Sequence, residues 1–206
     1  GAIEKHVLEN GLTVLIKENH TIRVVSVGSF SLAGARLDPP DGAGLSNFVA
    51  NAMPRGTRRR RAEKISEAFD SMGVSYSCSA NHTRIQSAMT LLAEDLRDGM
   101  EIFSDILINP RFDEDEIEKE RELIQAAILA RSDDWNTDAM DRMLGHLFER
   151  HPYGRCPLGT AETVAGFTRD DLVRHHGYYV TPNNTVVTVF GDVEAEETLE
   201  LVERTM

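Results

Sequence analysis

The order of predicted strands and helices constrains the fold of this chain more than any other feature. Residues 6–17 and 23–32 have the apolar and β-branched character of strands, and Asn10-Gly11 predicts a hairpin within the first segment. Residues 74–80 and 84–92 form a second predicted strand pair, and residues 184–190 form a last strand. Helical segments separate these groups, at residues 44–53, 62–72, 95–108, 113–131 and 137–150. Thr168 as N-cap with Asp171 at N3 predicts a further helix start, and residues 194–206 have helical periodicity. Antiparallel strand groups separated by helix pairs predict the α+β class.

Composition excludes several classes of function. The chain has 206 residues and a net charge of −12, which argues against nucleic acid as its main partner. No apolar run approaches the roughly 18 residues that a membrane span needs, and the first residues lack the features of a signal peptide. We therefore expect a soluble domain without a membrane partner. Two cysteines, Cys78 and Cys156, do not define the compartment, which stays unknown (cytoplasmic or periplasmic in a bacterium).

Arg58 to Arg61 are four consecutive arginines in an otherwise acidic chain. We interpret them as a solvated loop that leads into a helix. A patch for nucleic acid or heparin is the alternative. No aromatic residue is interleaved, and Glu63 and Glu67 follow closely, so the solvated loop is the preferred interpretation.

The helix predicted at residues 44–53 carries an unusual polar strip in the sequence GLSNFVANAMPRGT. At about 100° per residue, Asn47 and Asn51 lie on one side, away from the main apolar stripe, with Ala50 beside them. Side chains four residues apart on a helix are placed to hold one metal ion. Asparagine amides are not among the usual zinc ligands, however, so the strip has metal-site spacing without metal-site chemistry.

This stretch resembles the signature helix of the insulinase, pitrilysin and mitochondrial processing peptidase family. That helix reads approximately G-x-A-H-F-L-E-H-M-x-F-K-G-T, in which the inverted zinc motif HxxEH supplies two histidine ligands and a glutamate base. Gly44, Phe48, Gly56 and Thr57 match the pattern. The resemblance implies that Asn47 and Asn51 replace the histidines, Ala50 replaces the base, and Ala127 replaces the third ligand, a glutamate.

Further segments resemble the same family in the same order along the chain. They are HVLENGLTVLIKEN (6–19), EKERELIQAAILARSDD (118–134), HPYGRCPLGTAETVAGFTRDDL (151–172) and YYVTPNNTVVTVFGDV (178–193). The resemblance implies one LuxS/processing-peptidase-like domain over residues 1–206, built from an antiparallel β-sheet with helices packed on one face. It also implies that this domain is the first of two in a non-catalytic half. The abrupt C-terminal end suggests a truncated chain.

The resemblance implies a function without catalysis. We expect the domain to bind and enclose peptide substrate as the inactive half of a clamshell metallopeptidase, with no cofactor of its own, although zinc is expected in the family. Its partner would be a catalytic half with an intact HxxEH, in the same polypeptide or as a separate subunit. The alternatives are an active metallopeptidase with a rebuilt metal site and a purely structural subunit of a larger complex.

Residues Val74, Ser75, Tyr76, Ser77, Cys78 and Ser79 align with the strand to which this family adds substrate peptides. Binding of that kind depends on backbone hydrogen bonds and needs no catalytic side chain. A plain sheet strand is the alternative. Tyr76 stands where the family usually has asparagine, so side-chain contacts do not carry over directly.

The remaining histidines and serines do not form an obvious site. His146 and His151 are five residues apart, which on a regular helix separates them by about 140° and prevents chelation of one ion. The adjacent His175 and His176 are interpreted as surface or capping residues. No G-x-S-x-G motif occurs, so no serine is marked as a nucleophile.

Overall fold

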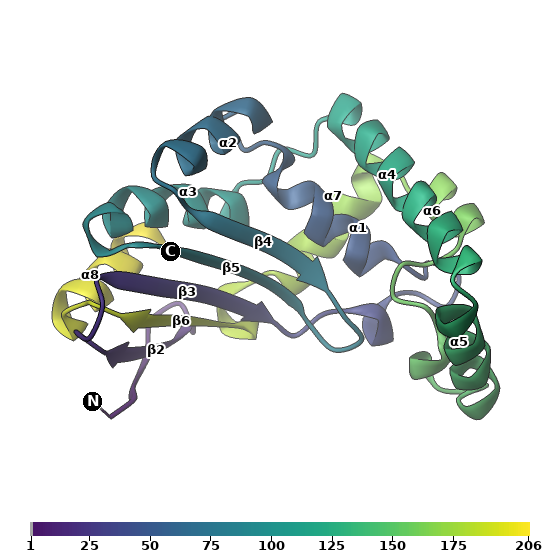
Figure 1. Cartoon of the computed structure of the whole chain (residues 1–206), viewed down its shortest axis with the longest axis horizontal. Helices are drawn as coiled ribbons and strands as arrows, with labels where there is room; N and C mark the ends of the chain where they lie inside the picture. Colours follow the sequence, from purple (N-terminus) through teal and green to yellow (C-terminus); the bar gives the residue numbers. More distant parts are fainter. Residues whose placement is uncertain (1) are drawn as a thin grey trace.

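The computed structural model describes residues 2–206 and confirms the α+β class (Figure 1). The strands form one six-stranded sheet in the order β1-β2-β6-β3-β5-β4. They span Glu4–Val7 (β1), Thr13–Glu18 (β2), Val24–Ser31 (β3), Ser75–Ala80 (β4), Ile85–Leu92 (β5) and Thr185–Gly191 (β6). Both predicted hairpins are present, since β1 pairs with β2 and β4 pairs with β5 in antiparallel register.

The sheet is mixed, whereas the sequence predicts a purely antiparallel one. β6 lies between β2 and β3, parallel to β2 and antiparallel to β3. The other pairs of the sheet are antiparallel. The pattern of residues along β2 does not identify a partner at the far end of the chain, so the sequence does not reveal this insertion.

The α-helices other than α6 follow the predicted segments, with ends that shift by a few residues, and no predicted segment covers α6. They span Leu45–Ala52 (α1), Ala62–Ser71 (α2), Leu96–Ile108 (α3), Glu114–Asp133 (α4), Trp135–Leu147 (α5), Ala161–Gly166 (α6), Arg169–Tyr179 (α7) and Ala195–Thr205 (α8). Thr168 caps α7, and the side chain of Asp171 returns a hydrogen bond to the Thr168 backbone, as its sequence predicts. Among the helices of residues 2–206, none is both long enough and apolar enough for a bilayer crossing.

Helices cover one face of the sheet, as expected. The covered face buries alternate residues of the central strands, including Val27, Val189 and Met89. The opposite face exposes small residues such as Ser26, Ser77 and Ala88. Figure 1 shows α1, α2 and α3 along the same side of the sheet, with α1 close to β4. The core therefore lies between the sheet and α1, at the place where the family signature falls.

Candidate functional site

A pair of glycines fixes the start of α1. Gly44 has a φ of 95°, in the left-handed region that favours glycine. A Cβ on Gly44 would lie 2.6 Å from the carbonyl oxygen of Leu158, and a Cβ on Gly159 would lie 2.3 Å from that of Ala43. The two backbones therefore contact each other directly. This contact joins the signature helix to the distant segment that resembles the same family.

Asn47 and Asn51 interact with each other rather than with an open cavity. The Asn51 side-chain amide donates to the Asn47 backbone oxygen at 2.8 Å and to the Asn47 Oδ1 at 3.2 Å. The placement of both asparagines away from the main apolar stripe does not by itself predict that Asn47 is only 6% exposed. It is buried because α4, α7 and the β4–β5 hairpin all pack against α1. Its Nδ2 atom finds no hydrogen-bond partner within residues 2–206.

The two alanines of the aligned site differ in their surroundings. Ala50 is completely buried in α1. Ala127 is exposed on α4, a helix that packs against α1. The structure thus brings together α1, which carries Asn47, Ala50 and Asn51, and α4, which carries Ala127. The role of these four positions stays a prediction.

The donor atoms at these positions do not fit zinc. Asn47 and Asn51 offer amides that bond to each other, and Ala50 and Ala127 offer methyl groups. Zinc in proteins is held by thiolate, imidazole or carboxylate. Across residues 2–206, no three His, Cys, Asp or Glu side chains are grouped closely enough to hold a metal ion. No step of zinc chemistry is therefore assigned to these side chains.

An ion pair that the sequence does not reveal joins the buried Glu120 of α4 to Arg55, in the turn that follows α1. Glu120 is 5% exposed, and its Oε2 accepts from Arg55 Nε and Nη2, each at 2.8 Å. Beside it, the Arg121 guanidinium lies 5.2 Å from the centre of the Phe48 ring. These contacts hold the two helices of the aligned site in fixed register. Their only sequence signal is the apolar spacing of α4, which places Glu120 on the same side as Ile117 and Ile124.

Asp38, Ser46 and His175 meet in the core, which the sequence analysis does not predict. Ser46 Oγ donates to Asp38 Oδ1 at 2.6 Å, accepts from the Gly34 backbone N–H at 3.0 Å, and lies 2.9 Å from His175 Nε2. Of the two interpretations of His175 and His176, as surface or capping residues, the first is wrong because both are buried. His176 Nε2 lies 2.8 Å from the backbone oxygen of Leu107, in the last turn of α3.

This group is structural rather than a hydrolase triad. The Ser46 proton is committed to the carboxylate, so the His175 Nε2 must be the donor in the remaining contact and does not act as a base toward the serine. Burial lowers the pKa of His175, an effect that His176 reinforces and nearby Asp38 opposes. The hydroxyl is also inaccessible, since Ser46 is 1% exposed. The group ties the start of α1 to α7.

β4 is an edge strand of the sheet, as the family alignment requires. At the hairpin turn, the Asn81 N–H donates to the Arg84 oxygen, so these two residues are a hydrogen-bonded pair. Such pairs recur at every second residue of an antiparallel ladder. The backbone groups of Ser79, Ser77 and Ser75 therefore face β5. The backbone groups of Tyr76 and Cys78 therefore point to the free edge. Val74 lies outside β4, and its N–H is already bonded to the Phe69 oxygen.

The side chains of Tyr76 and Cys78 point into the core. Tyr76 stacks on Phe69 with ring centres 5.2 Å apart. Burial raises the pKa of the Cys78 thiol to about 11, so this cysteine stays protonated at neutral pH. The serines on the other side of the strand are exposed. The edge therefore offers backbone groups and small side chains, and no reactive group.

The remaining pair of histidines is not a metal site in this geometry. α5 ends at Leu147, with His146 exposed beside Glu149. His151 precedes a short turn, and its Nδ1 accepts from the Tyr153 backbone N–H. The two imidazoles have separate structural partners.

Known proteins share this sequence and fold. The sequence profile described as insulinase (peptidase family M16) matches residues 13–161, and that of the peptidase M16 inactive domain matches residues 166–206. An uncharacterized zinc protease of Rickettsia bellii is 28% identical over 197 residues, which cover 96% of this chain and 48% of that protein. A probable mitochondrial-processing peptidase subunit beta of Arabidopsis thaliana is 26% identical, over 96% of this chain and 37% of that protein.

Solved structures show the same fold. A protease from Helicobacter pylori superimposes with a TM-score of 0.94 at 22% identity, over 100% of this chain and 50% of that one. A peptidase M16 inactive domain from Pseudomonas fluorescens has the same TM-score at 16% identity, over 99% of this chain and 50% of that one. The chain spans about half the length of these relatives or less. On the match over residues 13–161, the chain belongs to the insulinase family of zinc peptidases, peptidase family M16.

Proposed function

We propose that this chain is a peptide-binding, non-catalytic domain of a two-part metallopeptidase. One observation carries the proposal: the free edge of β4 lies beside α1, in which the aligned zinc positions hold asparagines and an alanine. An extended peptide would add to β4 as a further strand. The hydrolytic chemistry would come from a partner that has an intact HxxEH motif.

The chemistry of the edge supports peptide binding without catalysis. Strand addition uses backbone N–H and C=O groups, which the free edge provides at Tyr76 and Cys78. Such binding depends little on side-chain identity. It therefore survives the replacement of metal ligands by Asn47, Asn51 and Ala127. The small exposed serines of β4 leave room for side chains of a bound strand.

The size of the relatives supports a partner. The chain covers 48% of the Rickettsia bellii zinc protease and 50% of the Helicobacter pylori protease. A catalytic half would therefore be either a second subunit or another part of the same polypeptide. Together the two halves would enclose the peptide.

Residue-resolved amide exchange tests the peptide site. Unstructured synthetic peptides, added to the protein together with its HxxEH partner, should slow exchange at the free-edge amides of Tyr76 and Cys78. The amides of Ser75, Ser77 and Ser79 already face β5, so they serve as internal controls. Protection of neither residue at saturating peptide would overturn the proposal and favour a purely structural subunit.

Metal content separates the proposal from an active enzyme with a rebuilt site. The protein should retain no stoichiometric zinc after dialysis, and peptide cleavage should appear only when the HxxEH partner is present. Stoichiometric zinc, or cleavage by this chain alone, would contradict a non-catalytic role.

A further inference from the structure

The loop between α1 and α2 presents arginines that have no internal counter-charge. Arg58, Arg59 and Arg61 are exposed. In the part of the chain from residue 2 to 206, Arg60 is the member of this run that forms an ion pair, with Asp105 at 3.3 Å. The adjacent Arg58 and Arg59 thus place two unpaired positive charges at the surface of a protein whose net charge is −12.

Thr57 holds this loop in one conformation. Its side chain is 1% exposed, and its Oγ1 donates to Asp105 Oδ2 at 2.5 Å. The same oxygen accepts the backbone N–H of Arg59 at 3.2 Å and of Arg60 at 3.0 Å. The Thr57 N–H donates to the Arg60 oxygen at 2.8 Å, which closes the turn. The arginine backbones are therefore fixed before any partner binds, which lowers the entropic cost of binding.

A second segment braces the loop from behind. Arg58 N–H donates to the Asn109 oxygen at 3.0 Å, and Arg111 N–H donates to the Gly56 oxygen at 2.9 Å. Phe112 has a φ of 52°, which is unusual for a bulky residue. The Arg169 guanidinium stabilises this bend by donating to the carbonyls of Phe112 and Arg111 at 3.0 and 3.1 Å.

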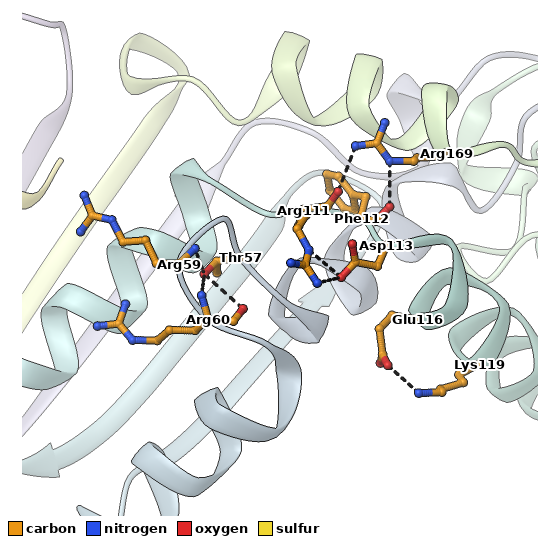
Figure 2. A network of polar contacts seen from close by, with 9 residues as sticks. All are labelled: Thr57, Arg59, Arg60, Arg111, Phe112, Asp113, Glu116, Lys119 and Arg169. Carbon is orange, nitrogen blue, oxygen red and sulfur yellow. Dashed lines mark hydrogen bonds and ion pairs between the residues drawn. The ribbon is translucent and has the colours of Figure 1, made fainter.

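Two arginines of the loop, Arg59 and Arg60, point away from the ion pairs behind it (Figure 2). Figure 2 shows the side chains of Arg59 and Arg60 extending together, away from the Arg111–Asp113 pair and from Arg169. The hollow behind the loop is lined by charges of both signs, including Arg61, Glu63 and Glu114. Because this hollow contains charges of both signs, it does not favour binding of an anion. The outer surface at Arg58 and Arg59 carries positive charge and does favour it.

The surroundings favour carboxylates on a polypeptide over a nucleic acid. Single-stranded nucleic acids bind through aromatic stacking as well as through charge, and the aromatics near the loop, Phe69 and Phe112, are buried. A long polyanion would also meet the negative field of the whole chain. A short acidic segment meets mainly the local arginines, whose planar guanidinium groups match carboxylates in paired hydrogen bonds.

We propose that Arg58 and Arg59 form a docking surface for a carboxylate-rich polypeptide segment of a partner protein. This surface is distinct from the edge of β4. It gives the fourfold arginine run a role beyond that of a solvated loop.

A labelled oligoglutamate peptide tests the docking surface by fluorescence anisotropy at low salt. The double variant Arg58→Gln/Arg59→Gln should bind the peptide about tenfold more weakly than the unaltered protein, since each exposed charge pair contributes modestly. The matched control Arg23→Gln/Arg150→Gln removes two exposed arginines elsewhere and should bind as the unaltered protein does. Added salt should weaken binding.

Three results would overturn the proposal. They are no oligoglutamate binding by the unaltered protein, equal weakening in both variants, and loop-dependent binding of a single-stranded oligonucleotide that exceeds that of oligoglutamate. The last result would assign the surface to polyphosphate instead. Added peptide should slow amide exchange at Tyr76 and Cys78 equally in the Arg58→Gln/Arg59→Gln variant and in the unaltered protein. The docking surface can therefore be disproved without disproving peptide binding at β4.

Discussion

The Asn51 side chain donates one amide group to both the backbone and the side-chain oxygen of Asn47, at 2.8 and 3.2 Å. The pair thereby satisfies part of its own hydrogen bonding on one face of α1. The Nδ2 group of Asn47 stays without a hydrogen-bond partner within residues 2–206. The same two positions would, with imidazoles, face one ion together, because residues four apart lie on the same side of a helix.

Rebuilding the family motif should create a zinc site. The quadruple variant Asn47→His, Ala50→Glu, Asn51→His and Ala127→Glu should bind zinc in a one-to-one ratio by calorimetry, because α1 and α4 are already packed together. The triple variant without Ala127→Glu should bind more weakly, since it lacks one ligand. A folded quadruple variant that binds no zinc would contradict the alignment of these four positions.

Replacing Gly44 with alanine should destabilise the fold by more than about 2 kcal/mol, because the new Cβ would overlap the Leu158 carbonyl oxygen in a left-handed conformation. Gly73 is the matched control: its φ of 63° is also positive, but no atom lies within 4 Å of the added Cβ. Gly73→Ala should cost about 1 kcal/mol. Urea unfolding of both variants measures the difference. An equal decrease in the free energy of unfolding in both variants would show that the close contact between Gly44 and Leu158 does not contribute to the cost of the substitution.

Removing the Glu120 carboxylate should weaken the packing of α4 against α1. We expect Glu120→Ala to lower the free energy of unfolding by about 1–3 kcal/mol, less than for a fully buried pair because the Arg55 side chain is 44% exposed. Glu67→Ala, which breaks the exposed pair with Lys64, should change it by less than about 0.5 kcal/mol. Similar changes in the free energy of unfolding for the two variants would show that the Glu120–Arg55 pair stabilises the fold no more than an exposed pair does.

Stability should fall in mild acid because of the two buried histidines. Burial lowers the pKa values of His175 and His176 below the ordinary value of 6.5. At pH values just below 6.5, the unfolded chain then binds more protons than the folded one. The stability that the two neutral histidines contribute is therefore complete above pH 6.5 and is lost as the pH falls below that value.

The His176→Gln variant should show a shallower decline between about pH 7 and pH 5 in urea titrations. His20 provides a control of opposite sign, since its hydrogen bond to Asp192 raises its pKa. His20→Gln should therefore make the decline steeper. A pH profile unchanged by His176→Gln would contradict the assignment of the loss to this residue.

Local patterns predicted the elements, and family resemblance predicted where the aligned positions fall. The Asn10-Gly11 turn, the Thr168 cap and the apolar spacing of α1 are encoded within a few residues, so the sequence identifies them. The burial of Asn47 was missed, because it depends on three elements that pack around α1 from distant parts of the chain. The meeting of Asp38, Ser46 and His175 was missed for the same reason, since no spacing along the chain signals it.

The position of β6 has a consequence for how the chain must assemble during synthesis. β1 and β2 reach the rest of the sheet through β6, which lies far beyond them in the sequence. Until Thr185–Gly191 has emerged, the first hairpin has no neighbour beyond itself, and β3 lacks its partner on one side. The unpaired edges of both pieces stay open to other chains until that strand has been made. Completion of the sheet is therefore a long-range event that a chain ending before β6 would never reach.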